Sequence, residues 1–146
     1  KNQNGLSISQ FTSALKYSKN NTTALAGRAG ARMAKGEYRS ALIDYTTAID
    51  IDSKFYPAHR GAGIAEFKLG DHKNAEKHLK KAKKLNKSDP QLYHYLMLNY
   101  LARDNIKQVK KSYAQFKNVA GSGELAEFKS SSKFAPIVRL IDDDDL

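Results

Sequence analysis

Small and apolar residues recur along the chain at a spacing of 34 positions. The repeated pattern lies between residues 22 and 87 and is carried mostly by alanine and glycine. Ala24, Gly27, Ala31, Gly36, Ala41 and Ala48 recur as Ala58, Gly61, Ala65, Gly70, Ala75 and Ala82. A fixed period of this length indicates a repeat architecture.

Each repeat contains two segments whose apolar and small residues follow helical spacing. Gly36 separates the segments of the first repeat and Gly70 those of the second, and glycine can end a helix in the left-handed conformation. The pattern predicts one antiparallel helix pair in 22–55 and another in 56–89. A single pair cannot bury its apolar face alone, so we expect an all-α solenoid of stacked pairs within one domain.

An additional helix is predicted before the first repeat, over residues 6–18. Phe11 and Ala14 lie 34 positions before Tyr45 and Ala48, which puts this helix in register with the second helices of the repeats. It is either the second half of an upstream repeat or an ordinary N-terminal capping helix, and the sequence favours neither.

A third, degenerate repeat is predicted over residues 90–120. Asp104 and Asn105 replace the glycine turn, and the larger Val109 and Phe116 stand where the first two repeats have alanines. We therefore expect the array to end here.

Two short C-terminal helices are predicted within 122–141. The second carries an apolar stripe at helical spacing, formed by Phe134, Ile137, Val138 and Ile141. One prediction is that these helices fold back over the end of the array, because a solenoid needs a capped terminal unit. The other is that the stripe enters a groove of its own or a neighbouring molecule, which would produce a homodimer contact.

The repeats resemble a known family. Two runs are similar to the tetratricopeptide repeat of short bacterial arrays. The first contains Ala29, Gly36-Glu37-Tyr38, Ala41, Tyr45, Ala48 and Ile51-Asp52, and the second has the same pattern from Gly63 to Asn86. The resemblance implies a right-handed superhelix whose first helices line a concave groove that binds segments of other proteins. Arg32 and Glu66 depart from it by replacing the customary tyrosine, which should weaken individual contacts.

The resemblance also implies which residues contact the ligand, at the inward positions of the first helices. These are Ala26, Gly30, Met33, Arg60, Ile64, Phe67, Lys68, His94, Leu98 and Leu101. Members that grip a C-terminal carboxylate of heat-shock chaperones use lysine and asparagine there, whereas these residues are mostly small or apolar. We expect an apolar groove for a helix or extended segment with hydrophobic anchors, or else burial of some of these residues between repeats.

The net charge of +10 makes an anionic partner an alternative. A basic ridge is predicted on the outward second helices, formed by Arg39, Lys73, Lys77, Lys80, Lys84, Lys107 and Lys111. It is either a solvated face or a contact for an acidic protein or anionic lipid. Nucleic acid is disfavoured because no aromatic residues for base stacking lie among the lysines.

No catalytic constellation is recognisable, and no cofactor is expected. The histidines lack the spacing of a zinc site and should lie at the surface: His59, His72, His78 and His94. The glycines at positions 27, 30, 61 and 63 form no phosphate loop, so close helix packing should explain them. There is no run of eighteen apolar residues, as a membrane span requires. The sequence indicates a binding protein rather than an enzyme.

Overall fold

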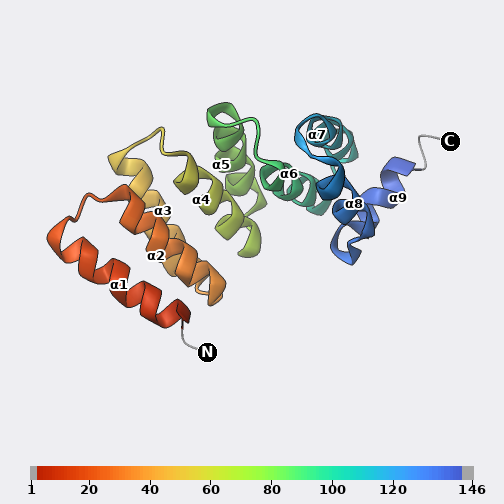
Figure 1. Ribbon diagram of the computed structural model, residues 1–146. Helices are drawn as coiled ribbons and strands as arrows, with labels where there is room; N and C mark the ends of the chain where they lie inside the picture. Colours follow the sequence, from red (N-terminus) through yellow and green to blue (C-terminus); the bar gives the residue numbers. More distant parts are fainter. Residues whose placement is uncertain (1–2, 143–146) are drawn as a thin grey trace. The chain divides into compact units, whose positions relative to one another are not determined.

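The computed structural model describes the backbone of residues 3–142 and the side chains of residues 8–141. Every element in the described part is helical, which confirms the all-α prediction (Figure 1). The chain falls into two compact units, Lys1–Leu85 and Asn86–Leu146. The helices of the first unit are α1 (Gln3–Tyr17), α2 (Thr22–Ala34), α3 (Tyr38–Ile51), α4 (Tyr56–Lys68) and α5 (His72–Leu85). Those of the second are α6 (Pro90–Ala102), α7 (Ile106–Val119), α8 (Ser122–Ser130), the 3-10 turn η1 (Ser132–Phe134) and α9 (Ala135–Asp142).

The turns inside the helix pairs have the predicted backbone conformation. Gly36 and Gly70 have φ angles of 78° and 82°, in the left-handed region that suits glycine. At the equivalent place in the third pair, Asp104 has φ 54°. Aspartate tolerates this conformation better than most residues, so it can replace the glycine.

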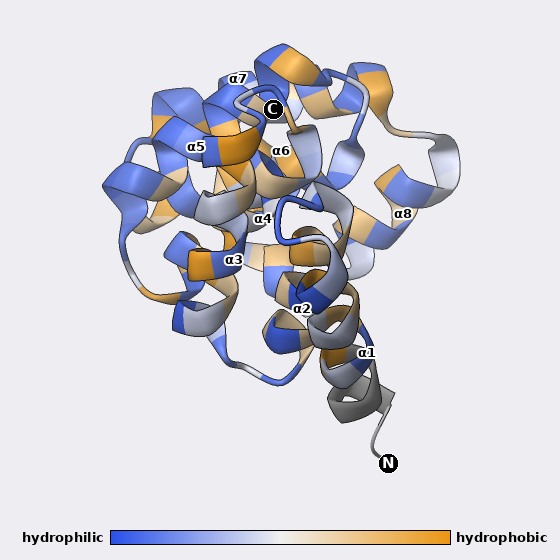
Figure 2. Cartoon of the chain, turned by 90° about the vertical axis from the view of Figure 1, so that its left-hand side faces the viewer, coloured by the Kyte–Doolittle hydropathy of each residue, from blue (hydrophilic) through white to orange (hydrophobic). Residues whose placement is uncertain are grey.

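In the first unit each helix packs against the next, and α2 also contacts α4. Ala41 and Ala48 of α3, and Ala75 and Ala82 of α5, are fully buried. Their small side chains let neighbouring helices approach closely. Figure 2 shows the ribbon of α5 as largely hydrophilic, since only its few apolar residues face the core.

Two helical glycines each pack against an aromatic ring of the preceding helix. A Cβ atom added to Gly27 would lie 2.4 Å from Phe11 Cζ, and one added to Gly61 would lie 2.1 Å from Tyr45 Cζ. Both contacts recur 34 positions apart, so α1 packs on α2 as α3 packs on α4. Gly63 similarly meets the side chain of Leu79. The packing explanation is confirmed for these three glycines.

Gly30 is different, and the packing prediction is wrong for it. This residue is exposed, and an added Cβ atom would meet nothing within 4 Å. The surface of α2 is therefore open at this point.

In the second unit, α8, η1 and α9 pack onto the pair formed by α6 and α7. The ring of Phe128 lies 5.0 Å from that of Phe116 and 4.6 Å from that of Phe134, measured between centroids. Ile137 is fully buried, while Val138 and Ile141 are half-buried. These helices therefore lie on the α6–α7 pair, whereas a cap over the end of the array and a contact between two copies of the chain stay predictions. No helix among the described residues combines the length and apolar composition that a membrane span requires.

Candidate functional site

The predicted ligand-contacting residues are divided between the two units. Seven of them lie on α2 and α4 of the first unit, and these two helices contact each other. The remaining three, His94, Leu98 and Leu101, lie on α6 of the second unit. A groove that joins both sets stays a prediction.

Six of the seven residues on α2 and α4 are at least partly accessible. Gly30 and Lys68 are exposed, whereas Ile64 is only 9% exposed and belongs to the core. We correct the predicted set by removing Ile64, because its side chain is used for packing. The α2–α4 face, as used below, comprises Ala26, Gly30, Met33, Arg60, Phe67 and Lys68. In the second unit, Leu98 and Leu101 are half-buried.

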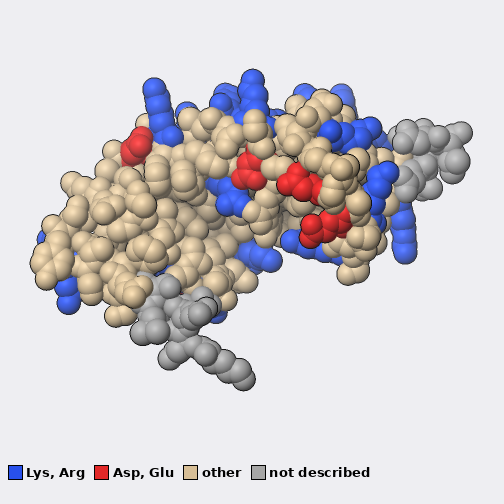
Figure 3. All heavy atoms as spheres, viewed as in Figure 1, with Lys and Arg blue, Asp and Glu red and all other residues tan. Residues whose placement is uncertain are grey.

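The lysines predicted to form a basic ridge are all exposed. Arg39 of α3 and four lysines of α5, Lys73, Lys77, Lys80 and Lys84, belong to the first unit. Lys107 and Lys111 of α7 belong to the second. Figure 3 shows basic side chains over α5 and, separately, over α7. Within the described part of the chain, one ridge residue forms an ion pair: Lys80 Nζ lies 3.3 Å from Glu76 Oε1. The continuity of the ridge from one unit to the next stays a prediction.

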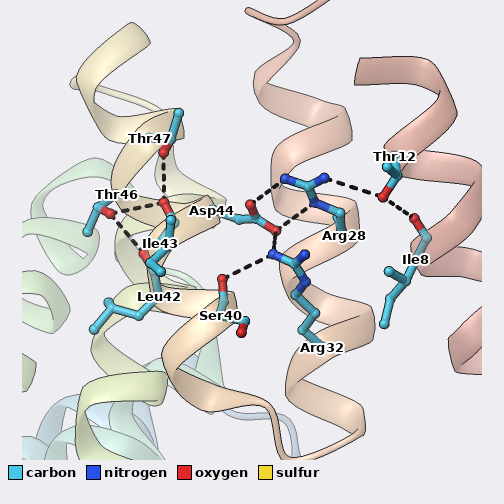
Figure 4. Close-up of polar contacts among 10 residues, drawn as sticks. All are labelled: Ile8, Thr12, Arg28, Arg32, Ser40, Leu42, Ile43, Asp44, Thr46 and Thr47. Atoms are coloured by element: carbon cyan, nitrogen blue, oxygen red, sulfur yellow. Dashed lines mark hydrogen bonds and ion pairs between the residues drawn. The ribbon is translucent and has the colours of Figure 1, made fainter. Parts of the chain in front are cut away.

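A polar cluster joins α1, α2 and α3 (Figure 4). Asp44, buried on α3, accepts hydrogen bonds from Arg28 Nη2 at 2.7 Å and from Arg32 Nη1 at 2.8 Å. Arg28 Nε also donates to Asp44, at 2.9 Å, and Nη1 donates to Thr12 Oγ1 at 3.3 Å. The hydrogen bond with Asp44 raises the pKa of Arg28, so its guanidinium stays charged.

The next repeat has a polar pair at the same positions, with the carboxylate on the first helix instead of the second. Glu66 and His78 lie 34 positions after Arg32 and Asp44, and His78 Nδ1 is 2.7 Å from Glu66 Oε2. The first helix thus carries the cation in one repeat and the carboxylate in the next. The family resemblance predicts that Arg32 and Glu66 weaken contacts, yet each has a polar partner on the second helix of its repeat. The matched spacing of Asp44 and His78 was the signal that could have revealed their partners.

The expectation of surface histidines is wrong for His59, and His94 is half-buried. His59 is only 5% exposed, its Nε2 lies 2.8 Å from the carbonyl oxygen of Ser53, and burial lowers its pKa. His94 packs among the rings of Phe116, Phe128 and Phe134. Within the described part of the chain, no three His, Cys, Asp or Glu side chains are grouped so that they could hold a metal ion.

Comparison with known proteins shows the fold of the chain. No family model matches it, and no curated protein matches it by sequence. Among solved structures it is similar to MamA, with 18% identity and a TM-score of 0.77, over 94% of this chain and 86% of MamA. It is also similar to YrrB, described as a TPR protein with an unusual peptide-binding site, with 20% identity and a TM-score of 0.73, over 88% of this chain and 64% of YrrB.

A third similar structure is the first TPR of Spaghetti (RPAP3) bound to the HSP90 peptide SRMEEVD. Its identity to this chain is 20% and its TM-score is 0.70, over 84% of this chain and 91% of that one. These structures share stacked helix pairs with the chain at low sequence identity, and their agreement supports the resemblance found in the repeats. The chain therefore has the fold of tetratricopeptide repeat proteins.

Proposed function

We propose that the chain is a non-enzymatic protein–protein interaction module that binds a segment of another protein on the α2–α4 face. The observation that carries the proposal is the open surface at Gly30, where an added Cβ atom would meet nothing within 4 Å. A ligand backbone can approach α2 closely there. Two proteins of the same fold, YrrB and the RPAP3 domain, are described as peptide-binding or peptide-bound.

The side chains around Gly30 suit a segment with hydrophobic anchors. Met33 and Phe67 are half-buried, so each keeps part of its apolar surface accessible. Lys68 is exposed at the end of α4 and would favour an acidic residue beside the anchors. Peptide grooves commonly combine apolar pockets with a few polar contacts in this way.

Replacing Gly30 by glutamate tests this surface. We expect the variant to lose the partner, because a charged side chain would occupy the open surface against an apolar ligand. It should fold at least as stably as the parent, since glycine in a helix is less favourable than glutamate by about 0.5–1 kcal/mol. Affinity capture with quantitative mass spectrometry, together with thermal unfolding, would measure both effects.

Two matched variants separate the site from general effects. Gly30→Ala adds only a methyl group and should weaken capture far less than glutamate does, and Thr47→Glu puts the same charge on an exposed position of α3. The proposal requires one set of proteins to be captured by the parent and by both controls, and lost only with Gly30→Glu. If that set is still captured by Gly30→Glu, the ligand binds elsewhere.

A second candidate function is binding of an anionic partner through the basic ridge. It is favoured by the exposed lysines of α5 in the ridge, of which only Lys80 forms an ion pair with a described residue. If the ridge binds an anionic partner, affinity should fall steeply between low and physiological salt. Added salt screens the attraction between the charges and makes the release of bound counter-ions less favourable.

The ridge can be tested by sedimentation with anionic lipid vesicles and by gel shift with a nucleic acid, both as a function of salt. Replacing Lys73 and Lys77 by glutamine should weaken binding about tenfold at low salt. Lys19→Gln and Lys35→Gln, exposed lysines outside the ridge, provide the matched control. Equal losses in both double variants would mean that net charge alone, rather than the ridge, attracts the ligand.

A further inference from the structure

A cavity of about 280 Å³ lies within the second unit, between the start of α6, the helix α8 and the turn η1. It has aromatic walls and a charged rim. The lining residues used below are His94, Tyr95, Glu124, Glu127, Phe128, Lys133 and Phe134. None of them was predicted as a ligand contact except His94.

The walls are formed by aromatic rings, and one ring nitrogen among them, on His94, has no hydrogen-bond partner among the described residues. The centroid of the His94 ring lies 4.6 Å from that of Phe134 and 5.3 Å from that of Phe128. His94 Nε2 is buried and has no hydrogen-bond partner among the described residues. Burial, reinforced by Lys133, lowers the pKa of His94, so the imidazole is neutral at pH 7. A neutral imidazole can accept a hydrogen bond.

The rim is negative although the chain as a whole is strongly basic. Glu124 and Glu127 of α8 are exposed, and Figure 3 shows acidic side chains gathered near α8. Glu124 Oε2 accepts a hydrogen bond from the backbone nitrogen of Gly121 at 2.9 Å, which fixes this carboxylate at the start of the helix. Among the described residues, none forms an ion pair with either carboxylate.

The rings beside the rim already hold a cation. Lys133 Nζ lies 4.9 Å from the centroid of the Tyr95 ring and 5.4 Å from that of Phe134. Such contacts arise because the face of an aromatic ring attracts positive charge. Lys133 is exposed, so its flexible side chain can move away when another cation enters.

We propose that this cavity binds the guanidinium group of an arginine side chain on a partner protein. A guanidinium is planar and stacks on aromatic rings. Its N–H donors can bind the exposed carboxylates of Glu124 and Glu127. A lysine ammonium is more strongly hydrated and does not stack, so it fits these walls less well. The inference rests on the proposed function only in taking the arginine from a protein.

The test is a titration of the full chain with acetyl-Gly-Arg-Gly-amide, followed by NMR of the His94 ring and of backbone amides in α8. We expect saturable shifts centred on the cavity, with millimolar affinity. The citrulline peptide has nearly the same shape without the charge, and should bind about tenfold more weakly. Saturation by the citrulline peptide at equal concentration, or no saturable shift with the arginine peptide, would overturn the proposal.

Charge variants test the sign of the rim. Glu127→Gln and Glu124→Gln should each weaken the arginine peptide about fivefold, and glutamine at 124 can still accept from Gly121. Lys133→Gln should strengthen binding severalfold, because the competing cation is removed. Weaker binding by Lys133→Gln would instead mean that the cavity takes an anion. Glu37→Gln, in the first unit, is the matched control and should leave the affinity unchanged.

This experiment is independent of the test at Gly30. The Gly30→Glu variant should bind the arginine peptide as the parent does, since the cavity lies in the other unit. If the α2–α4 face does not bind the partner, Gly30→Glu still captures it. If the cavity does not bind arginine, the peptide titration shows no saturable shift.

Discussion

Replacing Asp44 by alanine is expected to lower the free energy of unfolding by about 3 kcal/mol, the lower end of the range for breaking a buried ion pair. The side chain of Asp44 is 3% exposed and balances two guanidinium groups. Without it, Arg28 and Arg32 would repel each other in a partly desolvated place. Their side chains are 18% and 22% exposed, so water can reach them and the loss stays near this lower end.

Urea unfolding followed by circular dichroism would measure this loss. Asp50→Ala removes an exposed carboxylate from the same helix and should change stability by less than about 0.5 kcal/mol. Asp44→Asn preserves the shape of the side chain, and its loss of unfolding free energy should lie between those of the two alanine variants. If Asp44→Ala and Asp50→Ala unfold at the same urea concentration, the cluster contributes nothing to stability.

The second prediction is that one substitution, glycine to alanine, changes stability in opposite directions at two helical positions. At Gly61 the new methyl group would collide with the buried Tyr45 ring, 2.1 Å from its Cζ. Separating the ring from α4 should cost about 2–3 kcal/mol. At Gly30 the methyl group meets nothing within 4 Å. The variant should gain about 1 kcal/mol, because alanine favours the helix.

Thermal and urea unfolding of the two variants would measure both signs. Gly27→Ala should lie between them, because the facing Phe11 ring is only half-buried and can shift. A Tyr45→Leu background should reduce the cost of Gly61→Ala, since the ring that collides is gone. Stabilisation by Gly61→Ala would show that α3 and α4 are not in close contact at this point.

The local structure of the repeats could be predicted from the sequence. The period of 34 positions marks the helix pairs, and Gly36 and Gly70 mark the turns. These features depend on backbone conformation and on residues close together in the chain. Such short-range preferences act in the same way in every repeat, so one sequence suffices to detect them.

The candidate site could be predicted only in part. The family resemblance implied that the residues of the α2–α4 face lie at inward positions of two adjacent first helices. It could not show that Ile64 is buried while Gly30, at the equivalent position one repeat earlier, is exposed. Helical periodicity gives the direction of a side chain, whereas its exposure depends on which helix covers it.

The polar pairs and the C-terminal cavity were decided by tertiary structure. Asp44 lies 12 positions from Arg32 and 16 from Arg28, and only the packing of α3 on α2 brings both guanidinium groups within 3 Å of its carboxylate. His94 was predicted as a groove residue, but folding of α8 and η1 onto α6 surrounds it with aromatic rings. The sequence by itself determined the helix pairs, because their signals are local and repeated. Contacts between side chains far apart in the chain occur once each, so only the folded structure decided them.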